Sequence, residues 1–446
     1  MSYDLIIRGG TVVREQETAP ADIAIIGQSI VDIAPDLPGN TRQEIDARGL
    51  HVFPGAIDPH VHFNEPGRTD WEGFATGSSA AAGGGVSCVF DMPLNSSPPT
   101  LDGPSFDAKR QAAEASSYVD FALWGGLTPG NLDKLEELAN RGVVGLKAFL
   151  CDSGIDDFPR ADDWTLFRGM MIARQLGLIV AVHAENHEIT AGLRQFARQQ
   201  NFTTVRHYLR SRPQITEIEA IGRAIALAGE TCCPLHIVHV STVRGIELVA
   251  EARAKGVDVT CETCPHYLTF TADDAERLGA IGKCAPPLRS PGDRDGLWEH
   301  LAGGRIDFVA SDHSPAPPSL KSAPDFFDCW GGIAGIQTLL PTLLSRSEVI
   351  APRKLARLTA SNAARRFRLP RKGRIEAGCD ADLTLVDLQE SYELTRDRLL
   401  DRHRLSPFVG IRFRGRIRRT LVRGQTVFVD GRIVGPPRGT LVRPET

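Results

Sequence analysis

The chain of 446 residues lacks long apolar runs, a strong charge imbalance and a signal-like start. A membrane-spanning helix needs about 18 or more consecutive apolar residues, and no such run is present, so we expect no membrane partner. Lys and Arg number 51 against 55 Asp and Glu, and these charges are spread along the chain, which argues against nucleic acid as a partner. Residues 1–8 hold no basic segment followed by an apolar one, so we expect no secretory signal.

Cysteines are few and follow no paired pattern. The nine include the adjacent Cys232 and Cys233, unlike the even, spaced set of a disulfide framework. Cys261 and Cys264 form one C-x-x-C, but a structural zinc site needs a second such pair and none follows. We therefore expect free thiols and a reducing, cytoplasmic location.

Two different patterns divide the chain. At both ends, short apolar runs alternate with turn residues, so we expect residues 1–53 and 371–446 to pair into one small β-sandwich domain. Between them, in residues 54–370, apolar β-branched runs alternate with helix-length segments, which predicts an α/β fold, a (β/α)8 TIM barrel. The eight runs are 52–57, 86–92, 119–124, 143–149, 178–182, 235–240, 257–261 and 306–310.

Polar residues follow these runs at the carboxyl ends of the predicted strands, where the active sites of such barrels form. In chain order they are Asp58, His60, His62, Lys147, His183, His239 and Asp312. Imidazole and carboxylate suit zinc and its first-row neighbours. A single H-x-H pair is a weak signal, but its coincidence with several other strand-end residues indicates a metal centre.

Two interpretations of Lys147 fit the sequence. Its apolar neighbourhood favours a neutral amine, because burial disfavours the charged form. The lysine could simply pair with a buried acid. Alternatively, the neutral amine could react with CO₂ to give a carbamate, whose two oxygens can bridge two cations.

The pattern Asp58-x-His60-x-His62 with Lys147, His183, His239 and Asp312 resembles the binuclear amidohydrolase superfamily, and in particular its cyclic-amidohydrolase branch. Residues 359–364 and 373–383 extend the resemblance over essentially the whole chain. It implies a hydrolase with two divalent cations, zinc first and iron, cobalt or manganese as alternatives. It further implies that His60 and His62 bind one cation, that His183 and His239 bind the other, and that a carboxylated Lys147 bridges them. Asp312 would bind the first cation and carry the catalytic proton.

Within this branch the chain is most similar to the allantoinase family, over residues 62–73, 91–95, 261–267, 283–289, 311–315 and 330–335. The resemblance implies hydrolysis of the hydantoin-ring amide of allantoin to allantoate by a metal-bridging hydroxide, a step of purine catabolism, in a homotetramer. It also implies that main-chain groups near Cys284, Ala285 and Ser314 hold the substrate together with the Asn95 side chain.

Alternative functions remain, some of them hydrolysis of other cyclic amides and some of a different class. Dihydroorotases carry an arginine where this chain has Asn64, and an asparagine where it has Ala285; the substrate carboxylate of dihydroorotate favours such a bidentate cation. Hydantoinase or dihydropyrimidinase activity is a closer alternative. A metal-free scaffold is disfavoured by the filled ligand positions, and a mononuclear deaminase would not need Lys147.

The other histidines receive structural interpretations. His236 is three residues before His239 on one predicted strand, so we expect it on the opposite face, under a helix. His187 is expected in solvent. His266 could either support the centre or serve in packing, and the sequence leaves this open.

Overall fold

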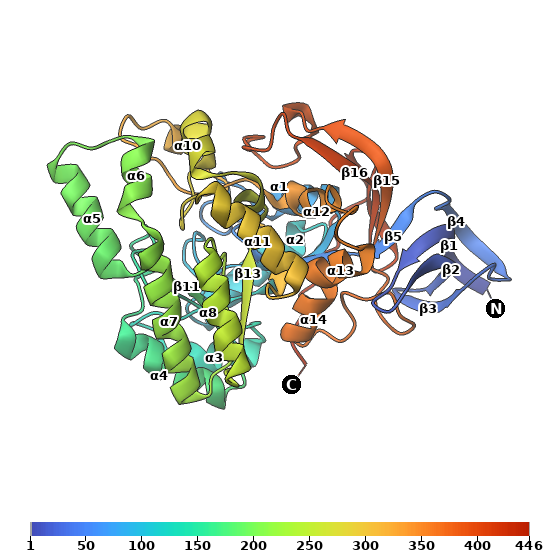
Figure 1. Ribbon diagram of the computed structural model, residues 1–446. Coiled ribbons are helices and arrows are strands. Elements are labelled where there is room, and N and C mark those ends of the chain that lie inside the picture. The colour runs from blue at the N-terminus through green and yellow to red at the C-terminus, as the bar shows by residue number, and fades with distance from the viewer. Residues whose placement is uncertain (1, 446) are drawn as a thin grey trace.

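The computed structural model describes residues 2–445, and its centre is a closed barrel of parallel strands (Figure 1). The barrel strands are β6 (Ala56–Val61), β7 (Val86–Asp91), β8 (Asp120–Leu123), β9 (Gly125–Gly126), β10 (Leu146–Phe149), β11 (Val180–His183), β12 (Leu235–Ile237), β13 (Val259–Thr263) and β14 (Phe308–Val309). β8 and β9 are two halves of one strand, the first paired with β7 and the second with β10. The His62 N–H donates to the His313 carbonyl at 2.8 Å and closes the ring next to β14. The predicted (β/α)8 barrel is confirmed.

The first predicted run is divided between two domains. Its first half is β5 (His51–Pro54), which pairs with β15 (Leu383–Glu393) outside the barrel. The barrel begins after Gly55, where a side chain would lie 2.3 Å from the Ser87 hydroxyl oxygen, so that only glycine allows this close approach. As a consequence Asp58 and His60 lie within β6 rather than beyond the first strand.

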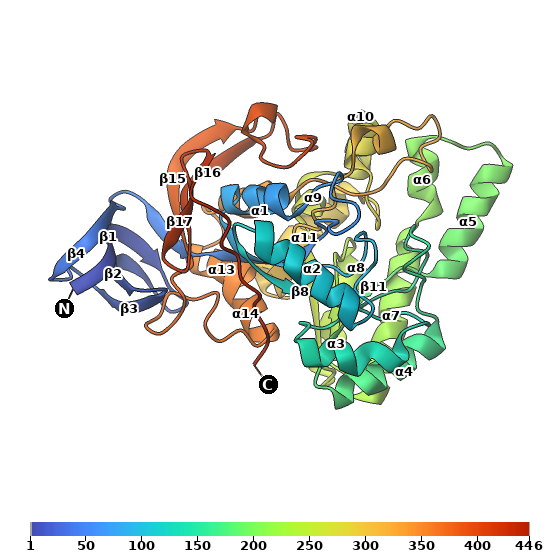
Figure 2. The ribbon, with the colours of Figure 1, turned by 180° about the vertical axis from the view of Figure 1, so that it is seen from behind.

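A nine-stranded sheet joins both ends of the chain into one β domain, with the order β18-β17-β16-β15-β5-β1-β2-β3 and β4 paired with β1. Its remaining strands are β1 (Ser2–Val13), β2 (Thr18–Ile26), β3 (Ser29–Ala34), β4 (Asn40–Asp46), β16 (Arg412–Val422), β17 (Gln425–Val429) and β18 (Arg432–Ile433). One apolar core includes Ile23, Val52 and Leu385, from both ends of the chain. Figure 2 shows the C-terminal tail running on across the barrel, where the Phe121 N–H donates to the Thr440 carbonyl at 3.1 Å.

Helices surround the barrel (Figures 1 and 2). They are α1 (Phe74–Gly83), α2 (Gly103–Ser116), α3 (Leu135–Arg141), α4 (Asp163–Gln175), α5 (His187–Gln199), α6 (Val205–Ser211), α7 (Gln214–Thr231), α8 (Val243–Ala254), α9 (Pro265–Thr269), α10 (Ala272–Leu278), α11 (Pro291–Gly303), α12 (Leu339–Leu344), α13 (Pro352–Ala356) and α14 (Asn362–Arg366). Within residues 2–445, none of them combines the length and the apolar character that crossing a membrane requires.

The amino end of the barrel is closed by α14. The Asn362 amide donates to the Asp307 carbonyl just before β14, at 2.5 Å. Phe367, which follows α14, packs edge-on against Phe90 and Trp124, with ring centroids 5.0 and 5.4 Å away. Because this end is filled with large apolar side chains, the opposite, carboxyl end is the part of the barrel that can hold a site.

Candidate metal centre and active site

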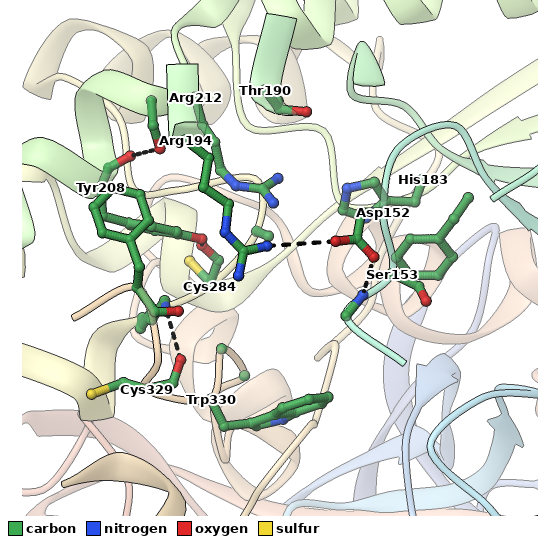
Figure 3. Close-up of a pocket in the computed structure, with 18 of the residues that line it drawn as sticks. Asp152, Ser153, His183, Thr190, Arg194, Tyr208, Arg212, Cys284, Cys329 and Trp330 are labelled. Carbon is green, nitrogen blue, oxygen red and sulfur yellow. Dashed lines mark hydrogen bonds and ion pairs between the residues drawn. The ribbon is translucent and has the colours of Figure 1, made fainter. Parts of the chain in front are cut away.

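A cavity of about 870 Å³ opens at the carboxyl ends of the barrel strands. Figure 3 shows His183 facing this space together with residues of the surrounding loops and helices. Five of the six predicted metal ligands line the cavity, namely His60, His62, His183, His239 and Asp312. The sixth, Lys147, lies on β10 with no exposed surface. The structure therefore places five of the six predicted ligands around one cavity at the carboxyl end of the barrel.

His60 and His62 both face the carboxylate of Asp312, which follows the eighth barrel strand. The Nε2 atoms of His60 and His62 lie 3.4 and 3.5 Å from Oδ1 of Asp312. On its other side, Nδ1 of His60 lies 2.6 Å from Oε1 of Glu262, at the end of β13. A carboxylate behind a ligating imidazole fixes the ring and selects the nitrogen that faces a metal. Glu262 was not among the sequence-predicted residues.

His183 and His239 form the second pair. Nδ1 of His183 lies 3.0 Å from Nε2 of His239, so the two nitrogens face one small volume. Helix caps fix both loops: the Asn186 side chain accepts from the Ile189 N–H at the start of α5, and the Thr242 side chain accepts from the Gly245 N–H at the start of α8. Each histidine is therefore followed within three residues by an anchored helix N-terminus.

His239 departs from the predicted strand. β12 ends at Ile237, and His239 adopts a φ of 39°, in the left-handed region. The alternation of strand faces therefore does not extend to His239, and the expectation that His236 faces away from the centre is wrong. Nε2 of His236 lies 3.1 Å from Glu262, the same carboxylate that contacts His60.

Lys147 is a buried amine without a partner. Its Nζ has no hydrogen bond and no ion pair among the described residues, so the interpretation as a lysine paired with an acid is not supported. Its Nζ lies 5.2 Å from the centre of the Phe149 ring. Burial lowers the pKa of Lys147 to about 8, which increases the neutral fraction of the amine near neutral pH.

The carboxyl groups around the centre differ in charge environment. Burial raises the pKa of Glu262 to about 8 and that of Asp58 to about 7. Burial would raise the pKa of Glu185 as well, but the charge of Arg212 together with the hydrogen bond and charge of His183 outweighs it and lowers that pKa to about 2. Several carboxyl groups and imidazoles are therefore buried at one place, an arrangement that a positive ion would stabilise.

The donor set fits divalent cations. One atom each of His60, His239 and Asp312 lie within 4.8 Å of one another. All ligand candidates except Lys147 are imidazoles or carboxylates, the donors that zinc and its neighbours prefer. The Nζ of Lys147 is buried without a partner among the described residues, and a carboxylate group added to it would supply two further oxygens.

The four predicted substrate-binding residues, Asn95, Cys284, Ala285 and Ser314, all line the cavity. The Ser314 N–H donates to the Ile333 carbonyl at 2.9 Å, so Ser314 would offer its hydroxyl or carbonyl to a ligand rather than its amide. The Cys284 carbonyl already accepts from the Tyr208 hydroxyl at 2.9 Å. Asn64, in contrast, is fully buried, and its side-chain amide donates to the Pro315 carbonyl at 3.4 Å.

Two other histidines also have defined places. His187, expected in solvent, lines the cavity at the start of α5. His266 is 1% exposed beside Tyr267, and neither of its ring nitrogens has a hydrogen-bond partner within residues 2–445. Glu185 and Glu262 were missed by the sequence analysis, although each lies at or just beyond a strand end and could have been found by examining acids next to the predicted ligands.

A barrel with this cluster at its carboxyl end is the architecture of a metal-dependent hydrolase, and the comparisons with known proteins agree. The amidohydrolase family matches residues 51–427, and the chain belongs to this family, whose members bind divalent metal ions. The chain is 56% identical to an allantoinase of Rubrobacter xylanophilus, over all of this chain and 98% of that protein. It is 50% identical to the allantoinase of Deinococcus radiodurans over the full length of both chains, and 43% identical to that of Escherichia coli over 96% of each.

Solved structures share the fold over the whole chain. An L-hydantoinase (dihydropyrimidinase) from Arthrobacter aurescens matches with a TM-score of 0.96 and 33% identity, covering 99% of this chain and all of that one. A dihydropyrimidinase from Brevibacillus agri matches with a TM-score of 0.93 and 32% identity, over 98% of both chains. These neighbours have the same combination of barrel and terminal β domain.

Proposed function

We propose that this protein hydrolyses the hydantoin-ring amide of allantoin and releases allantoate. The observation that carries the proposal is the full-length similarity to several allantoinases, combined with a cavity in which histidines, a carboxylate and Asn95 meet above a buried lysine. The cavity, at about 870 Å³, has ample room for a small cyclic amide.

We further propose that His60, His62 and Asp312 hold one divalent cation, zinc as the first candidate, and that His183 and His239 hold a second. Lys147 is proposed to react with CO₂, forming an N–C bond and losing a proton, and the resulting carbamate would help to hold the cations. The lack of any partner for the Lys147 amine supports this assignment. When bound, the two cations supply Lewis acidity and lower the pKa of a bound water.

The chain's own residues carry out the remaining tasks. Asp312 accepts a proton from the attacking water and passes it to the ring nitrogen as the C–N bond breaks and the C–O bond forms, so one group acts as base and then as acid. Asn95, Ser314 and the main chain at Cys284 and Ala285 orient the ring from the cavity wall. Glu262 keeps His60 oriented by its contact with Nδ1.

A substrate panel tests the proposal. The purified protein is assayed with allantoin, hydantoin, dihydrouracil and dihydroorotate, and kcat/KM is compared. We expect allantoin to be preferred and dihydroorotate to be nearly inactive, because position 64 holds a buried Asn where dihydroorotases carry an arginine for the substrate carboxylate. Preference for hydantoin or dihydrouracil would instead support the second candidate function, which the close structural match to hydantoinases favours. Equal rates with dihydroorotate would refute the substrate assignment.

A location in the cytoplasm and assembly as a homotetramer remain predictions. The cytoplasmic location is supported by nine cysteines that are all free thiols, eight of them buried. The tetramer rests on the family resemblance alone, and size-exclusion chromatography with light scattering tests it.

A further inference from the structure

A buried acid–base pair lies directly behind one of the proposed metal ligands. Glu185, with no exposed surface, accepts through Oε2 from Nε2 of His183 at 2.8 Å. The same oxygen forms an ion pair with the guanidinium of Arg212. Figure 3 shows Arg212 and His183 among the residues that line the cavity. The order of contacts is therefore Arg212, Glu185, His183 and then the proposed metal centre.

This chain of contacts selects one form of the histidine. A carboxylate bonded to a guanidinium can only accept hydrogen bonds, so the imidazole proton of His183 is held on Nε2. The lone pair of His183 then lies on Nδ1, the nitrogen that faces His239. Without Glu185, Nδ1 could carry the proton instead, and that form cannot bind a metal through Nδ1.

We propose that Glu185 and Arg212 are positioning residues that hold His183 in its metal-binding tautomer. The proposal rests on the proposed function only in assuming that His183 binds a metal, not in the choice of substrate.

Arg212 is itself held in place, which supports a fixed role. Its guanidinium lies 5.8 Å from the centre of the Tyr208 ring, and the Tyr208 hydroxyl is anchored on the Cys284 carbonyl. Its backbone carbonyl accepts from Arg289 Nη1 at 2.6 Å. The Arg212 side chain is 17% exposed, so it reaches the cavity while it contacts Glu185. Behind the first histidine pair, Glu262 forms no ion pair with an Arg or Lys among residues 2–445 and instead contacts two imidazoles, His60 and His236.

The test compares metal affinity and histidine tautomer in variants of the full chain. Affinity is measured by competition with a chelator, using zinc as the probe. We expect Glu185→Ala and Arg212→Met to weaken binding of one of the two zinc ions about 10–100-fold, the usual effect of removing such a support. Arg212→Lys should restore most of the affinity, because it keeps a cation beside Glu185. In the metal-free protein, the ¹⁵N spectrum of labelled histidine should show Nε2-protonated His183 in the wild type and a mixture in Glu185→Ala.

A matched control separates positioning from stability. Lys372→Met breaks another buried ion pair, with Asp120, which lies 2.5 Å from Lys372 Nζ at the amino end of β8. This variant should lower the melting temperature without changing zinc affinity. Should Glu185→Ala bind both zinc ions as tightly as the wild type and keep His183 protonated on Nε2, the proposal is overturned. That result would leave the substrate assignment untouched, since the panel assay tests it separately.

Discussion

Several residues at the candidate site adopt a backbone conformation that side-chain-bearing residues seldom use. The φ angles are 45° for Asp312, 69° for Asn95, 65° for Asn64 and 39° for His239. Asn and Asp tolerate this left-handed region best, but for other residues it costs free energy. Such strain is often concentrated where a protein orients functional groups, and here it turns the chain sharply as it leaves the strands.

The conformation of Asp312 makes Asn the informative substitution. Asp312→Asn keeps a side chain that accepts the left-handed conformation and an oxygen that can still contact a metal, but the amide cannot carry a proton. We expect turnover to fall by about 10²–10⁴-fold, the usual contribution of a general acid–base, with most of the metal retained. Steady-state kinetics combined with elemental analysis checks both parts. Wild-type turnover would show that another group moves the proton.

Lys147 allows a chemical rescue. Lys147→Ala removes the amine that would form the carbamate and leaves a small buried space in its place. We expect loss of metal and activity, and partial return of both when a short carboxylic acid is added, because a free carboxylate supplies two oxygens. Lys147→Arg should not be rescued by bicarbonate, since a guanidinium forms no carbamate. Near-normal turnover of Lys147→Ala without any additive would contradict the bridging role.

At the scale of elements, the sequence predicted most strands but not where they end. The first run spans β5 and β6 because the β domain and the barrel meet at Gly55, a contact between segments distant in sequence. The sixth strand ends at Ile237, before His239, because the chain turns there into the cap of α8. Local patterns carry no information about such long-range contacts, which decide the boundaries.

The packing of Phe367 at the amino end of the barrel gives a prediction at the scale of elements. Phe367 is 1% exposed and contacts the rings of Phe90 and Trp124. Phe367→Ala should destabilise the protein by about 3–5 kcal/mol, the usual cost of removing a buried aromatic ring, while metal content stays unchanged. Denaturant unfolding followed by elemental analysis measures both. A variant with an unchanged free energy of unfolding would mean that the packing of Phe367 does not stabilise the barrel.

At the scale of the whole molecule, the barrel, the β domain from both ends and the family could be predicted from the sequence. The ligand candidates could be named as well, from their positions at strand ends and from the family resemblance, and their role as ligands stays a prediction. Their supporting acids could not: Glu262 lies 202 residues from His60, and a single Glu carries no signal of its own. The ends of β6 and β13 meet only because the barrel closes, and no single segment of the sequence shows this contact.

The central claim is that six residues from five barrel strands or their ends form one centre for two cations, and counting the metal ions tests it most directly. The protein is purified without added chelator, and metal is quantified per chain by elemental analysis, before and after dialysis against a chelator. We predict two ions per chain, loss of activity with their removal, and recovery of both on adding back zinc. One ion per chain in a fully active protein would indicate a mononuclear centre, and an active protein with none would contradict the account.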